Sequence, residues 1–160
     1  MPKKPGKPEE PDRLVVENRK ARHDYFIDET LEVGLALQGS EVKAVRANLV
    51  SIGEGFIRVT ETPPTLTLHQ VHIGEYGPAG ELGHRPVRAR VLLAHKREIV
   101  RIARKMAKGM TIVPLKLYFK DGWAKLLIGV ARGKKAHDKR HSIAERDAKR
   151  DIQRAMSRRA

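Results

Sequence analysis

The chain has 160 residues, and with 33 Lys or Arg against 19 Asp or Glu its net charge is +14 at pH 7. This length favours one domain with a real core, and the charge favours a polyanionic partner. The lack of cysteine excludes disulfides and thiolate metal sites, and no apolar run approaches the ~18–20 residues of a membrane span. We therefore expect a soluble, cytoplasmic protein that uses no membrane, with a monomer as the simplest state.

The first part of the chain is polar and then turns β-like. Residues 1–12 hold four prolines among mixed charges, and we expect a disordered N-terminal segment. Leu14 to Phe26 is interpreted as a basic, polar patch after a short apolar opening. Tyr25 to Leu37 alternates apolar and polar residues, which predicts a strand with a bend at Gly34.

Short elements follow. Gln38-Gly39 predicts a turn, and Ser40 to Arg46 predicts a short helix with Ser40 as its N-cap. Ile52 to Val59 and Thr65 to Ile73 predict two strands, and the second follows the breaker Pro63-Pro64. Gly74 to Pro86 is rich in Gly, Pro and His, which indicates a mobile loop.

The clearest elements come next. Ala94 to Lys108 predicts a helix with one apolar and one basic face, ended by Gly109. Thr111 to Phe119 alternates strictly, with Val113, Leu115, Leu117 and Phe119 expected on one face. Asp121-Gly122 predicts a tight hairpin turn, and Trp123 to Ala131 returns as the partner strand.

Several short strands with flanking helices predict a mainly β (α+β) protein. Our first interpretation is an oligonucleotide-binding-fold-like barrel, closed or partly open, over residues 13–132, and the second is a split αβ sandwich. Residues 133–160 form a separate basic C-terminal tail.

The tail concentrates positive charge. Between Arg132 and Ala160 eleven Lys or Arg stand against four acids, without any aromatic residue. Ser142-x-x-Glu145 predicts a capping box, and a thin apolar stripe recurs every four residues beyond it. Because so thin a stripe cannot hold an isolated helix in water, we expect the tail to be disordered when free and helical against RNA.

Other charged segments allow two interpretations, a binding role or a purely structural one. Asn18 to His23 is either an RNA-contacting cluster or a solvated basic segment, and Gly39 to Lys43 by itself favours simple helix capping. The helix cations Arg97, Arg101, Arg104 and Lys105 slightly favour a phosphate-binding ridge. His69 and His72 would point to opposite faces of a strand, and the sequence has no HExxH, Walker or GxSxG motif. We therefore expect no metal, no cofactor and no enzymatic activity.

Three segments resemble the SmpB family of transfer-messenger-RNA-binding proteins. They read NRKARHDYFIDETLEVGLALQGSEVKAVRA, then HKREI, then VPLKLYFKDGWAKLLIGVARGKKAHDKR, in the family's order, and the likeness runs from Val16 to Arg140. The resemblance implies an oligonucleotide-binding-fold body that grips the tRNA-like domain of transfer-messenger RNA and delivers it to stalled ribosomes. It also implies that the tail folds in the decoding centre and empty mRNA channel. Alanyl-tRNA synthetase and elongation factor Tu with GTP are indirect partners.

The resemblance also implies functional residues. Those matching RNA-binding positions, together with neighbouring cations, are Asn18, Arg19, Lys20, Arg22, His23, Glu32, Gly39, Glu41, Lys43 and Arg46. Those matching the ribosome-binding tail are Gly133, Lys134, Lys135, His137, Asp138, Lys139, Arg140 and Met156. A carboxylate such as Glu32 beside RNA either accepts from base amino groups or orients an arginine.

Two departures from the family pattern are visible. The segment Asn48-Leu49-Val50-Ser51 replaces a common Gly-Lys pair, and Ala155 replaces a larger aliphatic residue beside Met156. The rival class is a constitutive ribosomal protein with a basic extension, which would occupy nearly every ribosome. A nuclease is the weaker alternative.

Overall fold

The computed structural model describes residues 13–78 and 83–158, and for residues 136–138 the backbone alone. The expected disorder of residues 1–12 therefore falls outside the described residues, as does the middle of the 74–86 loop. The elements are β1 (Arg13–Glu17), α1 (Arg19–Asp24), β2 (Tyr25–Leu35), α2 (Gly39–Arg46), β3 (Val50–Ser51), β4 (Phe56–Thr60), β5 (Thr65–His69), β6 (His72–Ile73), β7 (Arg90–Leu93), α3 (Lys96–Lys105), β8 (Met110–Lys120), β9 (Trp123–Gly133) and α4 (Ala136–Arg158).

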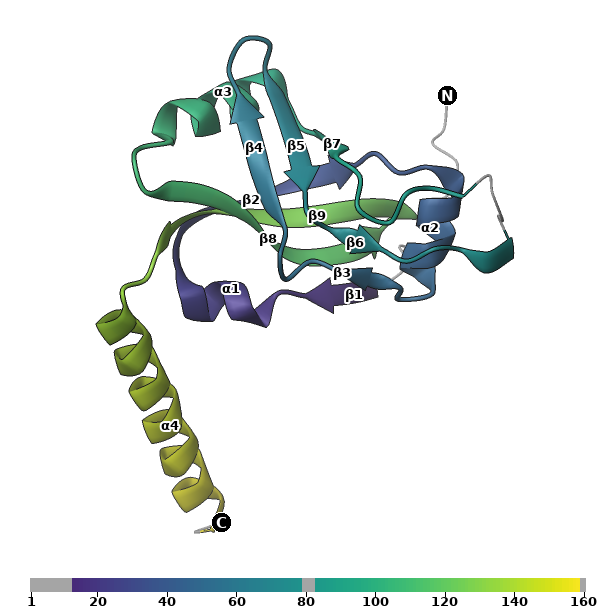
Figure 1. Ribbon diagram of the computed structural model, residues 1–160. Coiled ribbons are helices and arrows are strands. Elements are labelled where there is room, and N and C mark those ends of the chain that lie inside the picture. The colour runs from purple at the N-terminus through teal and green to yellow at the C-terminus, as the bar shows by residue number, and fades with distance from the viewer. Residues whose placement is uncertain (1–12, 79–82, 159–160) are drawn as a thin grey trace, which may run out of the picture.

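Seven strands make one antiparallel sheet that returns on itself. The order is β1-β8-β4-β5-β7-β2-β9, and a further pairing of β8 with β9 completes a ring (Figure 1). The ring falls short of a full barrel because β4 and β8 share a single register pair, Ile57 with Ile112. The prediction of a mainly β, oligonucleotide-binding-like fold with flanking helices is confirmed, and a sheet that closes in this way does not fit a split αβ sandwich.

The β8–β9 hairpin is the centre of the fold and was predicted from sequence. Asp121 and Gly122 both have positive φ, 51° and 79°, the turn geometry that matches the right-handed twist of a two-residue hairpin. The strands pair from Lys120 with Trp123 to Met110 with Arg132. Both strands of this long ladder supply residues to the main core, among them Ile112, Leu117, Leu126 and Ile128.

A bulge in β8 changes which face its side chains occupy. The register shifts between Pro114 and Lys116, so Val113 and Leu115 enter a small second core outside the ring, while Leu117 enters the main one. The prediction that these residues share one face with Phe119 is therefore wrong. An extra residue reverses the alternation, and no feature of the apolar spacing reveals it.

Some elements differ from the sequence prediction. Strand β1 and helix α1 replace the expected polar patch, and the expected strand 52–59 is interrupted by a turn at Gly53-Glu54 before β4 begins. In β2 the irregularity falls between Ile27 and Glu29, while Gly34 allows close approach of the Leu93 side chain from β7.

The helices also begin and end differently. The N-cap of α2 is Gln38 rather than Ser40, and the Ser40 hydroxyl instead lies 2.9 Å from Nδ1 of the buried His84. Helix α3 ends at Lys105, so Gly109 (φ 83°) belongs to the following turn.

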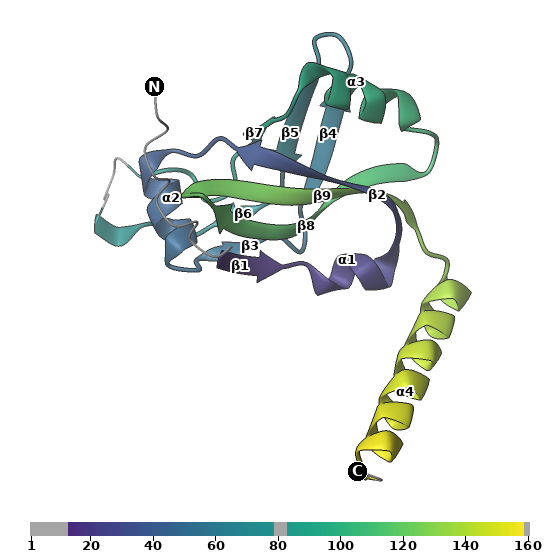
Figure 2. The same cartoon turned by 180° about the vertical axis from the view of Figure 1, so that it is seen from behind.

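The helices sit at separate places around the ring. Both views show α3 at the β4–β5 end, α1 beneath β8, and α2 and α4 at opposite ends of the body (Figures 1 and 2). Helix α4 projects from the body, and all its side chains from Ile143 to Arg158 are exposed. Within the described residues, no helix combines the length and apolar composition needed to cross a bilayer.

Candidate nucleic-acid interface

Helix α1 presents the first group of cations. Its only buried side chain is Ala21, which packs in the second core, and Arg19, Lys20 and Arg22 are exposed around it. Among the described residues, no ion pair involves Arg19 or Arg22. The helix therefore offers unneutralised positive charge to solvent, as the sequence predicted for this segment.

Asn18 stands at the start of this helix and is 6% exposed. Its Oδ1 accepts from the Ala21 backbone N–H at 3.1 Å, and its Nδ2 donates to the Pro114 carbonyl at 2.9 Å. The Asn18 backbone N–H donates to the Leu115 carbonyl at 2.7 Å. Asn18 thus links α1 to β8 through its side chain and its backbone.

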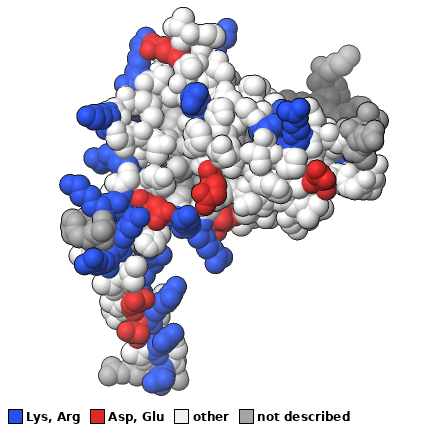
Figure 3. Space-filling view, viewed as in Figure 1, with Lys and Arg blue, Asp and Glu red and all other residues white. Residues whose placement is uncertain are grey.

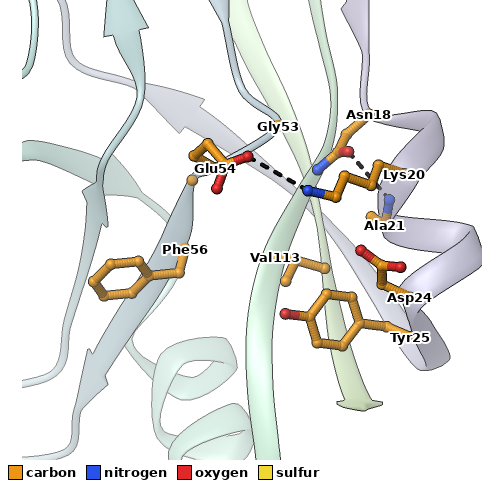
Figure 4. A pocket seen from close by; sticks show the side chains of 10 residues that line it. Asn18, Lys20, Ala21, Asp24, Tyr25, Gly53, Glu54, Phe56 and Val113 are labelled. Carbon is orange, nitrogen blue, oxygen red and sulfur yellow. Dashed lines mark hydrogen bonds and ion pairs between the residues drawn. The ribbon is translucent and has the colours of Figure 1, made fainter. Parts of the chain in front are cut away.

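A hollow of about 190 Å³ lies beside α1 (Figure 4). Side chains of α1 and of the β3–β4 turn form its walls, and Lys20 Nζ lies 3.5 Å from Glu54 Oε1 across it. Both side chains of this pair are largely exposed, so the pair contributes little to stability and Lys20 can exchange Glu54 for a phosphate at small cost.

The first turn of α4 rests against α1. Lys134 Nζ donates to the Arg22 carbonyl at 3.1 Å and to Ser142 Oγ at 3.0 Å, and it lies 4.9 Å from the Phe26 ring centroid. Lys139 Nζ is 3.3 Å from an Asp24 carboxylate oxygen. Figure 3 shows Lys and Arg gathered at this junction and along α4, with some acidic residues among them, so the cations of α1 and of the tail lie on neighbouring parts of the surface.

A second basic group lies at the α2 end, where cations stack on aromatic rings. Lys43 Nζ lies 5.3 Å from the Tyr76 ring and the Arg46 guanidinium 5.8 Å from the Phe119 ring. Arg13 donates to the Arg46 carbonyl at 2.8 Å. The sequence prediction included Lys43 and Arg46 but missed Arg13, because nothing local indicates that β1 runs beside α2.

Glu41 does not belong to this surface. It is fully buried, where Oε1 accepts from Arg88 and Oε2 from Arg90, each at 2.5 Å. Because a carboxylate enclosed by two arginines has no exposed oxygen for a ligand, the role of Glu41 in RNA binding stays a prediction, and such a role would be indirect. Gly39 is exposed, and a Cβ there would meet nothing within 4 Å.

Glu32 already has partners within the protein. Its carboxylate accepts a short hydrogen bond from the Tyr118 hydroxyl, and Lys120 Nζ lies 3.8 Å away. The group is solvent-accessible, so it can still accept from a base amino group. His23 lies half-buried at the end of α1, with Nδ1 3.9 Å from Asp24.

The expected phosphate-binding ridge on α3 is largely neutralised. Arg101 and Lys105 bind the two oxygens of Glu29 at 2.8 and 2.5 Å, and Arg104 binds Glu61 at 2.9 Å. The hydrogen bond from Lys105, with the charge of Arg101, lowers the pKa of Glu29 below its ordinary value of 4.5. These cations are paired with acids of β2 and of the β4–β5 turn, and α3 lies at the β4–β5 end of the body, away from α1 (Figures 1 and 2).

Helix α4 carries the predicted charge but begins earlier than predicted. The helix starts at Ala136, so Ser142 is an interior residue and the expected capping box is absent from these described residues. Glu145 lies 3.3 Å from His141 Nδ1. The late apolar side chains Ile152 and Met156 are 58% and 70% exposed. The side chains of His137 and Asp138 lie outside the described residues.

The remaining predicted tail residues lie where β9 ends and α4 begins. Gly133 ends β9, where a Cβ would meet nothing within 4 Å, and Lys135 and Arg140 are exposed. No group of three or more metal-ligating side chains occurs in the described parts of the chain.

A small β ring that carries exposed cations on α1 and at the α2 end and extends into a basic helix is typical of a nucleic-acid-binding protein. The family model described as "SmpB protein" matches residues 15–158. The chain belongs to this family, which comprises RNA-binding factors and not enzymes.

Individual relatives agree along the whole chain. An SsrA-binding protein of Lactobacillus helveticus is 48% identical over 92% of this chain and 97% of its own length, and one of Frankia casuarinae is 48% identical over 100% and 97%. A chain from the structure described as "tmRNA-SmpB: a journey to the center of the bacterial ribosome" superposes with a TM-score of 0.63. It is 47% identical, over 76% of this chain and 85% of that one.

Proposed function

We propose that this chain binds the tRNA-like domain of transfer-messenger RNA and delivers it to stalled ribosomes for trans-translation. The observation that carries the proposal is the basic surface of α1 and the start of α4, whose Arg19 and Arg22 are exposed and have no ion pair among the described residues. The names of the relatives, which bind SsrA RNA, and the ribosomal setting of the similar structure support it. Such a factor would work in the cytoplasm.

The proposal divides the work between a body, residues 13–132, and a tail, residues 133–160. The tail would occupy the decoding centre and the empty mRNA channel, where its exposed cations would lie against RNA phosphates. Helix α4 supports this because all its side chains from Ile143 to Arg158 are exposed and open to a partner. Elongation factor Tu with GTP and alanyl-tRNA synthetase would act on the bound RNA, and not necessarily on this chain.

A truncation separates the two parts. Removal of residues 134–160 should leave affinity for a tRNA-like RNA fragment within a few-fold of the full chain and abolish peptide tagging in a reconstituted translation system. A loss of RNA affinity as large as the loss caused by removing α1 cations would contradict the division. Association with nearly every ribosome in a cell extract would instead indicate a constitutive ribosomal protein.

Salt dependence tests the basic surface. With about five phosphate contacts, log K should fall against log salt with a slope of about −4 to −5. Arg19→Gln should reduce this slope by about one contact, whereas Arg104→Gln, a matched change at a cation already paired with Glu61, should leave it unchanged. A flat response in the wild-type protein would refute the phosphate-contact proposal.

A further inference from the structure

We propose that Asn18 is a positioning residue: it serves RNA binding without touching RNA, by holding α1 so that Arg19, Lys20 and Arg22 face the ligand. This inference rests on the proposed function. It differs from the interpretation of Asn18 to His23 as a cluster whose members all contact RNA directly.

The first argument is that both ends of the Asn18 amide are engaged inside the protein. Oδ1 caps α1 through the Ala21 N–H, and Nδ2 reaches across to the Pro114 carbonyl in β8 (Figure 4 shows the cap). With 6% of its surface exposed, the residue has almost no area left for a ligand. A direct contact would require RNA to replace two buried hydrogen bonds, which leaves polar atoms unpaired.

The second argument concerns where the acceptors come from. The β8 bulge falls between Pro114 and Lys116, at the place where β1 stops pairing with β8. The carbonyls of Pro114 and Leu115 consequently accept from one residue, the first through the side chain of Asn18 and the second through its backbone. The bulge and Asn18 together form a hydrogen-bonded connection between strand β8 and helix α1.

The third argument is that the stability and orientation of α1 depend on this connection to β8. A six-residue helix is too short to be stable by its own hydrogen bonds, and Ala21 is its only buried side chain. Its other side-chain ties among the described residues include two ion pairs: the largely exposed pair of Lys20 with Glu54, and the pair of Asp24 with Lys139 of α4. The two hydrogen bonds of the Asn18 side chain are buried, unlike these ion pairs, and therefore do most to set the direction in which the three cations point.

The test is a double-mutant cycle read through the salt slope. Asn18→Ala is made in the wild-type chain and in a chain in which Arg19, Lys20 and Arg22 are all Ala, and binding of a tRNA-like fragment of transfer-messenger RNA is titrated at several salt concentrations. In the wild-type background we expect at least a ten-fold loss of affinity and a slope smaller by about one to two contacts. In the triple-Ala background the same change should cost less than two-fold.

Equal losses in both backgrounds with an unchanged slope would overturn the inference, because that is the signature of a direct hydrogen bond. An Asn18→Ala chain that binds like the wild type would overturn it as well. Asn18→Ser provides a second variant if Asn18→Ala unfolds, since Ser can cap α1 but cannot reach Pro114, and an intermediate loss is expected. If the wild-type chain shows no preference for the tRNA-like fragment over random RNA of equal length, the proposed function fails, and the cycle can still be read on random RNA.

Discussion

The buried carboxylate of Glu41 gives the sharpest prediction about stability. Glu41 and Arg90 are both fully buried, and Arg88 reaches the same carboxylate. Glu41→Gln keeps the volume but removes the negative charge, so Arg90 remains buried without its counter-ion. Breaking a buried pair in this way costs about 3–5 kcal/mol, a large share of the ~5–15 kcal/mol that stabilises a typical domain. For a chain of this size the melting temperature should fall by roughly 6–20 °C.

Thermal and urea unfolding followed by circular dichroism would measure this loss. The matched control is Glu54→Gln, which removes the same charge from a side chain that is 82% exposed and 3.5 Å from Lys20. That change should cost less than about 1 kcal/mol. If the two variants lose equal stability, Glu41 does not hold α2 against β7 and the reasoning fails. A large loss confined to Glu41→Gln would also explain an RNA-binding defect without any contact between this carboxylate and RNA.

Three further predictions follow from single interactions. The pKa of Glu29 is lowered in the folded state, so its charge stabilises the protein above pH ~4.5, and this stabilisation is lost as the pH falls through the folded-state pKa. Glu29→Gln should therefore be less stable than wild type at pH 7, and the difference in stability should vanish at acid pH. A stability difference that does not change with pH would contradict this. Gly122→Val places a β-branched residue at φ 79° and should lower the free energy of urea unfolding by about 1–2 kcal/mol. The control Gly53→Val, at a position where a Cβ meets nothing within 4 Å, should lower it less. Equal losses in the two variants would refute the argument. Asp24→Asn should weaken the contact with Lys139 and speed amide exchange in the first turns of α4, and unchanged exchange would show that this ion pair does not hold the helix.

The sequence predicted the features that depend on neighbours along the chain. The alternation in β8 and β9 and the Asp121-Gly122 turn are local, so the hairpin was predicted with nearly its observed limits. Helix α1 was missed because it is short and charged, and its stability comes from β8, about a hundred residues further on.

The same distinction holds for the candidate site. Exposed cations such as Arg22 and Lys43 could be predicted from charge and from the family resemblance. The burial of Glu41 could not, because its partners Arg88 and Arg90 stand 47 and 49 residues away in sequence. The pairing of Arg101 and Lys105 on α3 could not be predicted for the same reason, since their acid Glu29 lies on a distant strand that only the fold brings alongside.

Helix α4 has a consequence that concerns geometry more than charge. Its 23 residues span ~34 Å at 1.5 Å per residue, so the helix sets both a reach and a rotational phase for whatever its far end meets. Two added residues would turn Met156 to nearly the opposite side, while seven would move it outward by ~10 Å and keep its side. While it is helical, α4 therefore fixes the distance and the facing of its far end, so inserting residues changes its contacts in a way that substituting residues does not.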